Sequence, residues 1–360
     1  MLIGRVSAAL VDVLVPAFGV GATKDFVTTS GIGEFMNNVF IKNSSKAFDG
    51  AASMQKFGEV FIEALPKHLE SLMIPGRLME EGFRSPPLHA QVEYVPELQD
   101  AMREVLYHPA TYEAHSCAEK AFKAFLEREV VDVGVLKFFN GWDETHKTTS
   151  LVSAKLIMRL SADARFVPVG KQESYSQVMA HMHEVAKDDF GLGQEGHDGM
   201  YAYMAAAFHA SGWEGNRYAV SECCEFSRFL YSMGVAKNKA AMTSFEHKNS
   251  IMNAMMVSVA SELWNGCEYN FIAQFIEKKL ISTRPSLRGD VKSLRDAKGY
   301  VMGHSGEVEN KHGMHALAAA QAFGRTVELE FEVGRLKEVM LDYNARVGVA
   351  FHSLCEALSG

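Results

Sequence analysis

The chain has 360 residues, with 36 basic and 44 acidic side chains, so its formal net charge at pH 7 is −8. Hydrophobic residues make up 48% of the chain and charged residues 22%, a balance that supports a sizeable core and argues against a disordered chain. Because binding of a phosphate backbone needs clustered Lys and Arg, and no such cluster is present, we expect no nucleic-acid partner.

The first residues contain an apolar stretch that only partly matches a secretory signal. It follows Arg5, and Asp12 and Pro16 interrupt it, so we expect no signal peptide. No later stretch is apolar over the length of a membrane-spanning helix, and the five cysteines lack CxxC spacing. The sequence therefore predicts a cytoplasmic protein with reduced cysteines and no membrane partner.

Apolar residues recur at steps of three and four along most of the chain, which is the spacing of one helix face. This spacing predicts helices over residues 114–131, 151–160, 200–209, 224–233, 251–263, 271–280 and 336–358. Alternation with period two is rare, and residues 326–331 are the one short strand candidate, with flanks that favour a helix. The sequence therefore predicts an all-α protein.

Two prolines in the polar stretch 85–95 mark the best candidate boundary. We expect an N-terminal helical extension over residues 1–90 and one large helical core over residues 91–360. The base rate alone favours a homodimer as the assembly.

Residues 188–197 form a glycine-rich corner between two predicted helices. Asp188 and Asp189 end the first helix, residues 191–196 fit a GxGxxG pattern, and His197 opens the second helix. A dinucleotide fingerprint needs a strand before its glycines, whereas the segment before these has helical spacing. Either these polar side chains are solvated, or the carboxylate faces the imidazole across the turn as in a metal site.

A second cluster, residues 304–315, holds three histidines and two glutamates. Within it Glu309 and His312, three positions apart, share a helix face, which is the Glu-x-x-His arrangement of di-iron carboxylate bundles. Each histidine taken alone is more often structural or exposed. The joint occurrence of this cluster and the earlier corner favours a metal site.

Together these motifs resemble those of the heme-oxygenase-like di-iron oxidases and oxygenases, which carry no haem. The segment from Asp189 through His197 resembles the family's acidic-x-Gly-x-Gly…His segment, and residues 304–313 resemble its His…Asp/Glu-x-x-His-Gly helix. The resemblance begins at about residue 108 and implies a heme-oxygenase-like multi-helical bundle. It makes the following residues metal ligands: Asp189, His197, His304, Glu309 and His312.

The spacing of His304 departs from the family's His-x3-Asp/Glu-x2-His pattern by one residue. In a regular helix His304 would lie ~140° from Glu309, too far round to share a metal. A single π-bulge near Gly306 would reduce this angle to ~40°. If no bulge forms, His315 becomes the candidate in place of His304.

The family's remaining ligand is a glutamate on a helix between the two clusters. Glu262 fits best because its helix face is otherwise largely apolar and a buried carboxylate needs a partner such as a metal. Glu268, beyond an expected helix break at residues 265–266, is the alternative. The family usually has glutamate in the place of Asp189, so Asp188 is an alternative there.

The resemblance implies a non-haem iron-dependent oxidoreductase with two Fe(II) ions and O₂ as co-substrate. Mixed carboxylate and imidazole ligands with open positions suit Fe(II). The expected reaction oxidises a small amino-acid-derived or aliphatic substrate, by N-oxygenation, desaturation or C–C cleavage, in specialised-metabolite biosynthesis. An electron donor is an additional partner that this chemistry allows.

Two other functions stay open. One is a metal-free oxidase of the same fold, similar to the cofactor-independent oxidase of pyrroloquinoline quinone synthesis, in which histidines bind substrate and O₂. The other is a helical interaction protein with a degenerate site, which holds a partner through its N-terminal extension. Thiaminase-like relatives are disfavoured because no cysteine lies beside either cluster.

Overall fold

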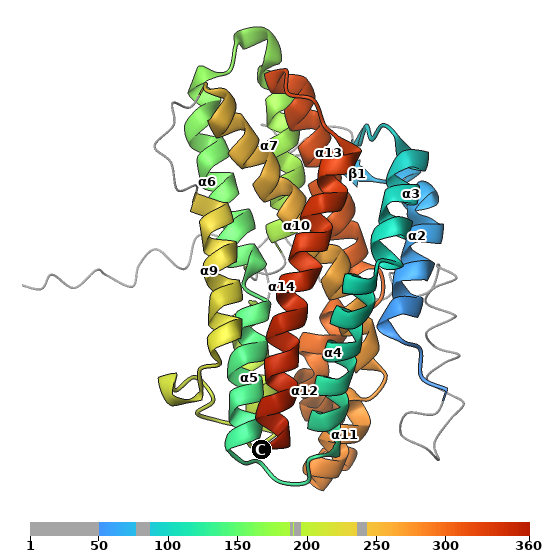
Figure 1. The fold of residues 1–360 in the computed structure, drawn as a ribbon, viewed down its shortest axis with the longest axis vertical. Coiled ribbons are helices and arrows are strands. Elements are labelled where there is room, and N and C mark those ends of the chain that lie inside the picture. Colours follow the sequence, from blue (N-terminus) through green and yellow to red (C-terminus); the bar gives the residue numbers. More distant parts are fainter. Residues whose placement is uncertain (1–49, 77–86, 188–189, 191–195, 236–242) are drawn as a thin grey trace, which may run out of the picture. The chain divides into compact units, whose positions relative to one another are not determined.

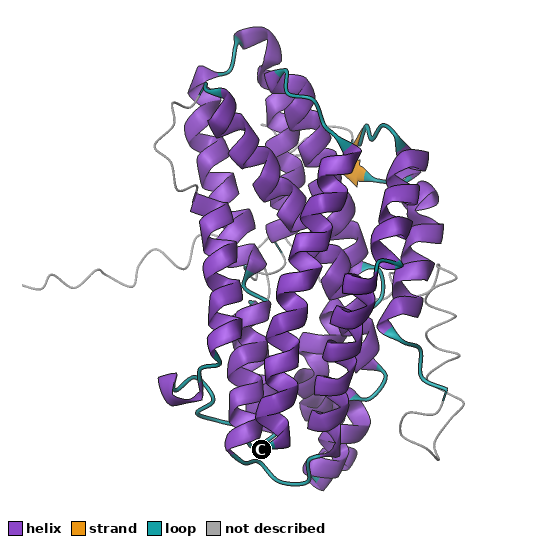
Figure 2. Cartoon of the chain, in the orientation of Figure 1, coloured by secondary structure: helices purple, strands orange, loops and turns teal. Residues whose placement is uncertain are grey.

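The computed structural model describes residues 50–76, 87–187, 190, 196–235 and 243–360, without the His197 side chain. Most of this described part is helical (Figure 2), and the strands β1 (Met73–Ile74) and β2 (Leu88–His89) form one short antiparallel pair. The predicted all-α class is therefore confirmed, and the protein is a multi-helical bundle. All described residues belong to one compact unit, Ser45–Gly360.

Figure 1 labels the α-helices along the chain. They are α2 (Met54–Glu70), α3 (Val95–Leu106), α4 (Pro109–Glu127), α5 (Val133–Thr145), α6 (Ala154–Asp163), α7 (Gln172–Ala186), α8 (His197–Ala207), α9 (Ser221–Val235), α10 (Phe245–Ala273), α11 (Ile276–Thr283), α12 (Val291–His304), α13 (Val308–Val327) and α14 (Val333–Ser359). A π-helical turn (Thr149–Ser153) precedes α6, and short 3₁₀ turns occupy Ala164–Phe166, Val169–Lys171, Asn216–Tyr218 and Pro285–Gly289.

Helix α10 is the centre of the bundle. From Ile251 to Ala273 all its residues except Asn253 and Leu263 are buried. Helices α13, α14, α2 and α12 all pack against it. Helices α4 and α14, more than two hundred positions apart in the sequence, lie side by side (Figure 1) because Gly348 lets α14 approach Ala114 closely.

One expectation about helix boundaries was wrong, and one was confirmed, because the flanks of 326–331 are helical. The predicted break at residues 265–266 is absent, because α10 runs on through Gly266, whose missing side chain makes room for α13. The strand candidate 326–331 forms no strand, because α13 extends to Val327 and Glu328 then turns with a left-handed φ of 57°.

The described part of the predicted extension packs onto the core. Helix α2 lies against α10 and α3, and Gln274 just after α10 exchanges two hydrogen bonds of 2.9 Å with the backbone of Ala52. Residues 1–49 lie outside the described part, and the boundary at residue 90 stays a prediction.

None of the described helices combines the length and apolar character that crossing a membrane requires. All five cysteines are free.

Candidate metal centre

Two glycines bring α10 and α13 close together in the middle of the bundle. A Cβ on Gly313 would lie 3.3 Å from the Cβ of Glu262, and one on Gly266 would lie 2.7 Å from Oδ1 of Asn310. Larger residues at these positions would hold the two helix backbones apart. The glycines therefore allow side chains on the two helices to converge over a short span.

Glu262 on α10 and Glu309 and His312 on α13 converge at this place. One ligand atom from each lies within 4.8 Å of the others. Nδ1 of His312 is 3.7 Å from Oε2 of Glu262 and 3.7 Å from Oε2 of Glu309. All three side chains are buried, with at most 4% of each residue exposed. Two carboxylates and an imidazole thus meet where solvent does not compensate their charge.

His304 joins this cluster through a turn. Helix α12 ends at His304, Gly306 adopts a φ of 81°, and α13 begins two residues later. Asn270 holds the turn by accepting a 2.8 Å hydrogen bond from the Gly306 amide and donating to its carbonyl at 3.2 Å. The reversal places Nδ1 of His304 2.5 Å from Oε1 of Glu309.

Of the two alternatives, no π-bulge forms: the chain breaks the helix with a glycine in the left-handed region, which glycine adopts without steric cost. His315 does not replace His304. Its Nδ1 instead lies 2.9 Å from Nδ1 of His181 on α7, and burial lowers the pKa of His315 to about 2. This second pair of imidazoles is therefore neutral.

The two carboxylates of the cluster titrate in opposite directions. Burial, together with the nearby Glu309 carboxylate, raises the pKa of Glu262 well above its ordinary value. Burial acts on Glu309 in the same sense, but His304 and His312 outweigh it and hold the pKa of Glu309 well below its ordinary value. The site thus combines one carboxylate whose pKa its imidazole neighbours lower with one whose pKa burial raises.

Glu268, the alternative to Glu262, lies outside this cluster although it is fully buried. Its Oε1 accepts one hydrogen bond of 2.7 Å from the indole of Trp142 and lies 2.7 Å from Nε2 of His146. Its Oε2 accepts a 2.7 Å bond from the indole of Trp264. Glu268 therefore has protein partners for both oxygens.

The sequence did not point to the hydrogen-bonded chain that continues from this group. Nδ1 of His146 lies 3.0 Å from the hydroxyl of Tyr300, which is 2.7 Å from the hydroxyl of Tyr269. The rings of both tyrosines pack on the imidazole of His304, at centroid distances of 5.4 and 5.0 Å. In the sequence, only the four-residue spacing of Trp264 and Glu268 indicates that these two side chains share a helix face and can contact each other.

Asp189 and the side chain of His197 lie outside the described residues, as does Asp188. The helices on either side of this segment are described. Helix α7 packs against α13, and α8 packs against α12, where the terminal methyl of Met200 lies over Gly299 and Gly303. Both flanking helices thus pack against the helices that carry His304, Glu309 and His312.

A cavity of about 250 Å³ lies next to the aromatic chain. Tyr300 and His146 form part of its wall, and Asp143, Lys147 and Asp198 add charges of both signs. The Lys147 ammonium lies 3.0 Å from the Asp143 carboxylate. Because Tyr300 also packs on His304, one side chain separates this cavity from the cluster.

Comparison with models of known protein families and with curated proteins gives no match. Among solved structures, the chain is similar to a TenA homolog from Pseudomonas syringae pv. tomato, at 10% sequence identity and a TM-score of 0.49. The match covers 78% of this chain and 97% of the homolog. A likeness at this identity concerns the fold and carries no information on activity.

Proposed function

We propose that this chain is a non-haem iron oxidase or oxygenase with a heme-oxygenase-like bundle, whose iron is held by Glu262, His304, Glu309 and His312. The observation that carries the proposal is the convergence of three buried metal-ligating side chains within 4.8 Å. Two buried carboxylates repel each other, and a divalent cation offsets that repulsion more completely than one shared proton. Asp189 and His197 complete a two-iron donor set in this proposal.

Carboxylate and imidazole donors together suit Fe(II), which activates O₂ for the oxidation of a small molecule when it is bound with open positions. The chain's own residues would fix the donors. The hydrogen bonds of Asn270 hold the turn that presents His304, and the close approach at Gly313 sets the separation of Glu262 from His312. The cluster is buried and two tyrosine rings pack on His304, and electrostatic interactions are stronger in such an environment than in water.

The cavity beside Tyr300 favours an amino-acid-derived substrate over a plain aliphatic chain. Its wall carries the Asp143 and Asp198 carboxylates, which suit the ammonium group of such a substrate, and the Lys147 ammonium, which already pairs with Asp143 and Glu144. Burial raises the pKa of Asp143, so an ammonium group would stabilise its charged form. The hydroxyl of Tyr300, held by His146 and Tyr269, is placed to orient a polar group of the substrate.

Iron binding by isosteric variants tests the proposal. We expect Glu262→Gln, Glu309→Gln and His312→Gln each to lower the iron bound per folded chain at least tenfold at limiting Fe(II), because each removes an anionic or imidazole donor. Glu268→Gln is the matched control, since it changes a buried carboxylate on the same helix that already has protein partners. Anaerobic Fe(II) titration, with metal analysis after gel filtration, gives the result.

Equal iron content in wild-type protein, in the three cluster variants and in Glu268→Gln would contradict the proposal. Absence of specific iron from all five proteins would support the metal-free oxidase of this fold. One contact favours that second function: His304 already lies 2.5 Å from Glu309, so protons alone compensate part of the buried charge.

A further inference from the structure

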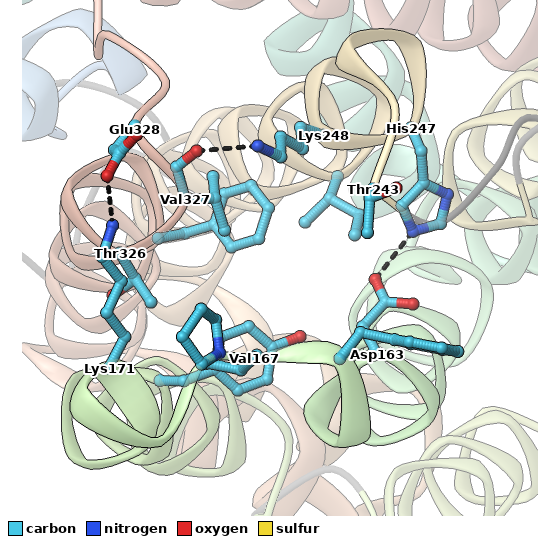
Figure 3. A pocket seen from close by; sticks show the side chains of 14 residues that line it. Asp163, Val167, Lys171, Thr243, His247, Lys248, Thr326, Val327 and Glu328 are labelled. Atoms are coloured by element: carbon cyan, nitrogen blue, oxygen red, sulfur yellow. Dashed lines mark hydrogen bonds and ion pairs between the residues drawn. The ribbon is translucent and has the colours of Figure 1, made fainter.

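A second cavity, with a volume of about 280 Å³, is lined by residues of α6, α10 and α13 and has charged groups that pair with one another. On one side Asp163 and His247 lie 2.7 Å apart (Figure 3). On the other side Lys171 and Glu328 lie 2.6 Å apart. These closed pairs indicate no class of ligand, whereas the polar side chains beside the metal cluster form a continuous chain.

Tyr300 is one of the two tyrosines of that chain whose rings pack on His304. It lies one helical turn before His304 on α12, and the centroids of the two rings are 5.4 Å apart. Its hydroxyl lies 3.0 Å from Nδ1 of His146, and 2% of the residue is exposed. An oxidant held at the cluster would therefore have this phenol as a direct neighbour.

The tautomer of His146 follows from its contact with Glu268. Both oxygens of Glu268 accept from tryptophan indoles, as those of an ionised carboxylate do, and such a group donates no hydrogen bond. Nε2 of His146, 2.7 Å from Oε1 of Glu268, therefore carries the proton, and Nδ1 keeps its lone pair. The Tyr300 hydroxyl donates to that lone pair and accepts from the hydroxyl of Tyr269.

A proton acceptor decides how readily a buried tyrosine is oxidised. Loss of an electron alone leaves a buried cation, which desolvation makes costly, whereas loss of the electron together with the phenolic proton leaves a neutral radical. Tyr300 has the imidazole of His146 for this proton. Tyr201 is also buried, but it donates its 2.6 Å hydrogen bond to the backbone carbonyl of Phe139, which is a much weaker base.

Aromatic rings connect Tyr300 with Trp213, on the connection between α8 and α9. The ring centroid of Tyr201 lies 4.9 Å from that of Tyr300 and 5.1 Å from that of Trp213. Trp213 is 9% exposed, more than Trp264 at 3% or the fully buried Trp142. Because electron tunnelling weakens steeply with distance, rings in contact carry single electrons better than one long step does.

We propose that Tyr300 is a redox-active tyrosine, which supplies single electrons to the metal cluster and is itself reduced through Tyr201 and Trp213 by a one-electron reductant at the surface. This inference rests on the proposed function, because the iron centre is the oxidant after its reaction with O₂. One electron leaves Tyr300 for that centre, the phenolic proton moves to Nδ1 of His146, and a neutral tyrosyl radical remains. One electron from the reductant and the return of the proton then restore Tyr300.

Rapid freeze-quench EPR spectroscopy tests this step on the full chain, loaded with Fe(II) and mixed with O₂ without substrate. Two Fe(II) ions supply two of the four electrons that reduce O₂ to water, so the chain must supply others under these conditions. We expect a tyrosyl radical signal, identified by its narrowing when the tyrosines carry deuterium. Tyr300→Phe should lower its yield at least tenfold. Tyr343→Phe, which removes another buried tyrosine hydroxyl, is the matched control and should leave the yield unchanged.

Two variants that keep Tyr300 make the test decisive even if Tyr300→Phe fails to fold. His146→Asn removes the imidazole that accepts the proton, so we expect the radical yield to fall at least tenfold. Trp213→Leu should leave the yield unchanged and slow the decay of the radical at least fivefold when ascorbate is the one-electron reductant.

Iron content, measured on the same samples, separates this inference from the proposed function. Chains that bind iron but form no tyrosyl radical, or that form it undiminished in Tyr300→Phe and His146→Asn, would overturn the role of Tyr300 alone. Unchanged decay in Trp213→Leu would overturn the route through Trp213. Chains that bind no iron would overturn both the iron function and this inference.

Discussion

At the scale of single residues, the buried carboxylate of Glu268 depends on donors from three other side chains. Its oxygens accept from the indoles of Trp142 and Trp264, and Nε2 of His146 lies equally close. In Glu268→Gln, the new amide must direct an N–H group toward one of these donors. We expect this change to lower the free energy of unfolding by about 1–3 kcal/mol, the cost of a buried unsatisfied donor. Denaturant unfolding measures it.

The control for this prediction is Glu277→Gln, which alters a half-exposed ion pair with Lys298 and should change stability by less than about 0.5 kcal/mol. Equal stability of Glu268→Gln and the wild type would contradict the stabilising role of these three contacts.

The sequence could predict which cluster residues share a helix face. Three-residue spacing placed Glu309 beside His312, and an apolar face singled out Glu262. It could not predict the partners of Glu268, because Trp142 and His146 lie more than 120 positions away and only the packing of α5 against the bundle brings them near. Nor could periodicity reveal that Asp163 and His247 meet.

At the scale of elements, the close approach of α10 and α13 positions the cluster. A Cβ at Gly313 already lies 3.3 Å from the Cβ of Glu262, so Gly313→Val forces the helices apart. We expect this change to lower the free energy of unfolding by about 1–3 kcal/mol, as overpacking does, and to weaken iron binding. Thermal unfolding and Fe(II) titration measure the two effects.

Gly299→Ala on α12 is the matched glycine control. Its Cβ would lie 3.4 Å from the flexible end of Met200, an ordinary contact, so we expect stability to rise by about 0.5–1 kcal/mol from the better helix propensity of alanine. If both substitutions had the same effect, the close approach at Gly313 would have no special role.

The helical spacing of apolar residues predicted most of the helices but not the turns that connect them. The extra residue between His304 and Glu309 indicated that the helix is interrupted there. Either a π-bulge or a turn can accommodate one extra residue, so the spacing alone did not decide between them. The choice depends on Asn270 of α10, whose side chain bonds both the amide and the carbonyl of Gly306. Such a contact between distant segments is invisible in local periodicity.

At the scale of the whole molecule, buried neutral histidines make the fold sensitive to acid. Burial lowers the pKa of His115 to about 4, and burial together with Arg325 lowers that of His181 to about 4. The ordinary pKa of an unfolded histidine is about 6.5, so between pH 4 and 6.5 the unfolded chain binds more protons than the folded one. The contribution of these histidines to the free energy of unfolding is therefore fully present above about pH 6.5, and it is lost as the pH drops toward 4.

Each such histidine contributes up to about 3 kcal/mol to this loss. We expect His115→Asn, which keeps a donor near the position of Nδ1, to flatten the dependence of unfolding free energy on pH between 6.5 and 4. His352→Asn, on the exposed face of α14, should leave the dependence unchanged. Denaturant unfolding at several pH values measures both. A slope unaltered by His115→Asn would show that His115 is protonated or exposed in the folded protein.

The all-α class of the molecule was predictable because helical spacing recurs along most of the chain. The cavities were not, since each is lined by residues from several elements that packing alone brings together.

The central claim is that the buried carboxylates and histidines of α10, α12 and α13 hold iron. Its most direct test is iron stoichiometry with Mössbauer spectroscopy on anaerobically reconstituted protein, before and after exposure to O₂. We predict close to two irons per chain, which become an antiferromagnetically coupled pair of ferric ions. Absence of specific iron uptake by the folded chain would contradict the claim.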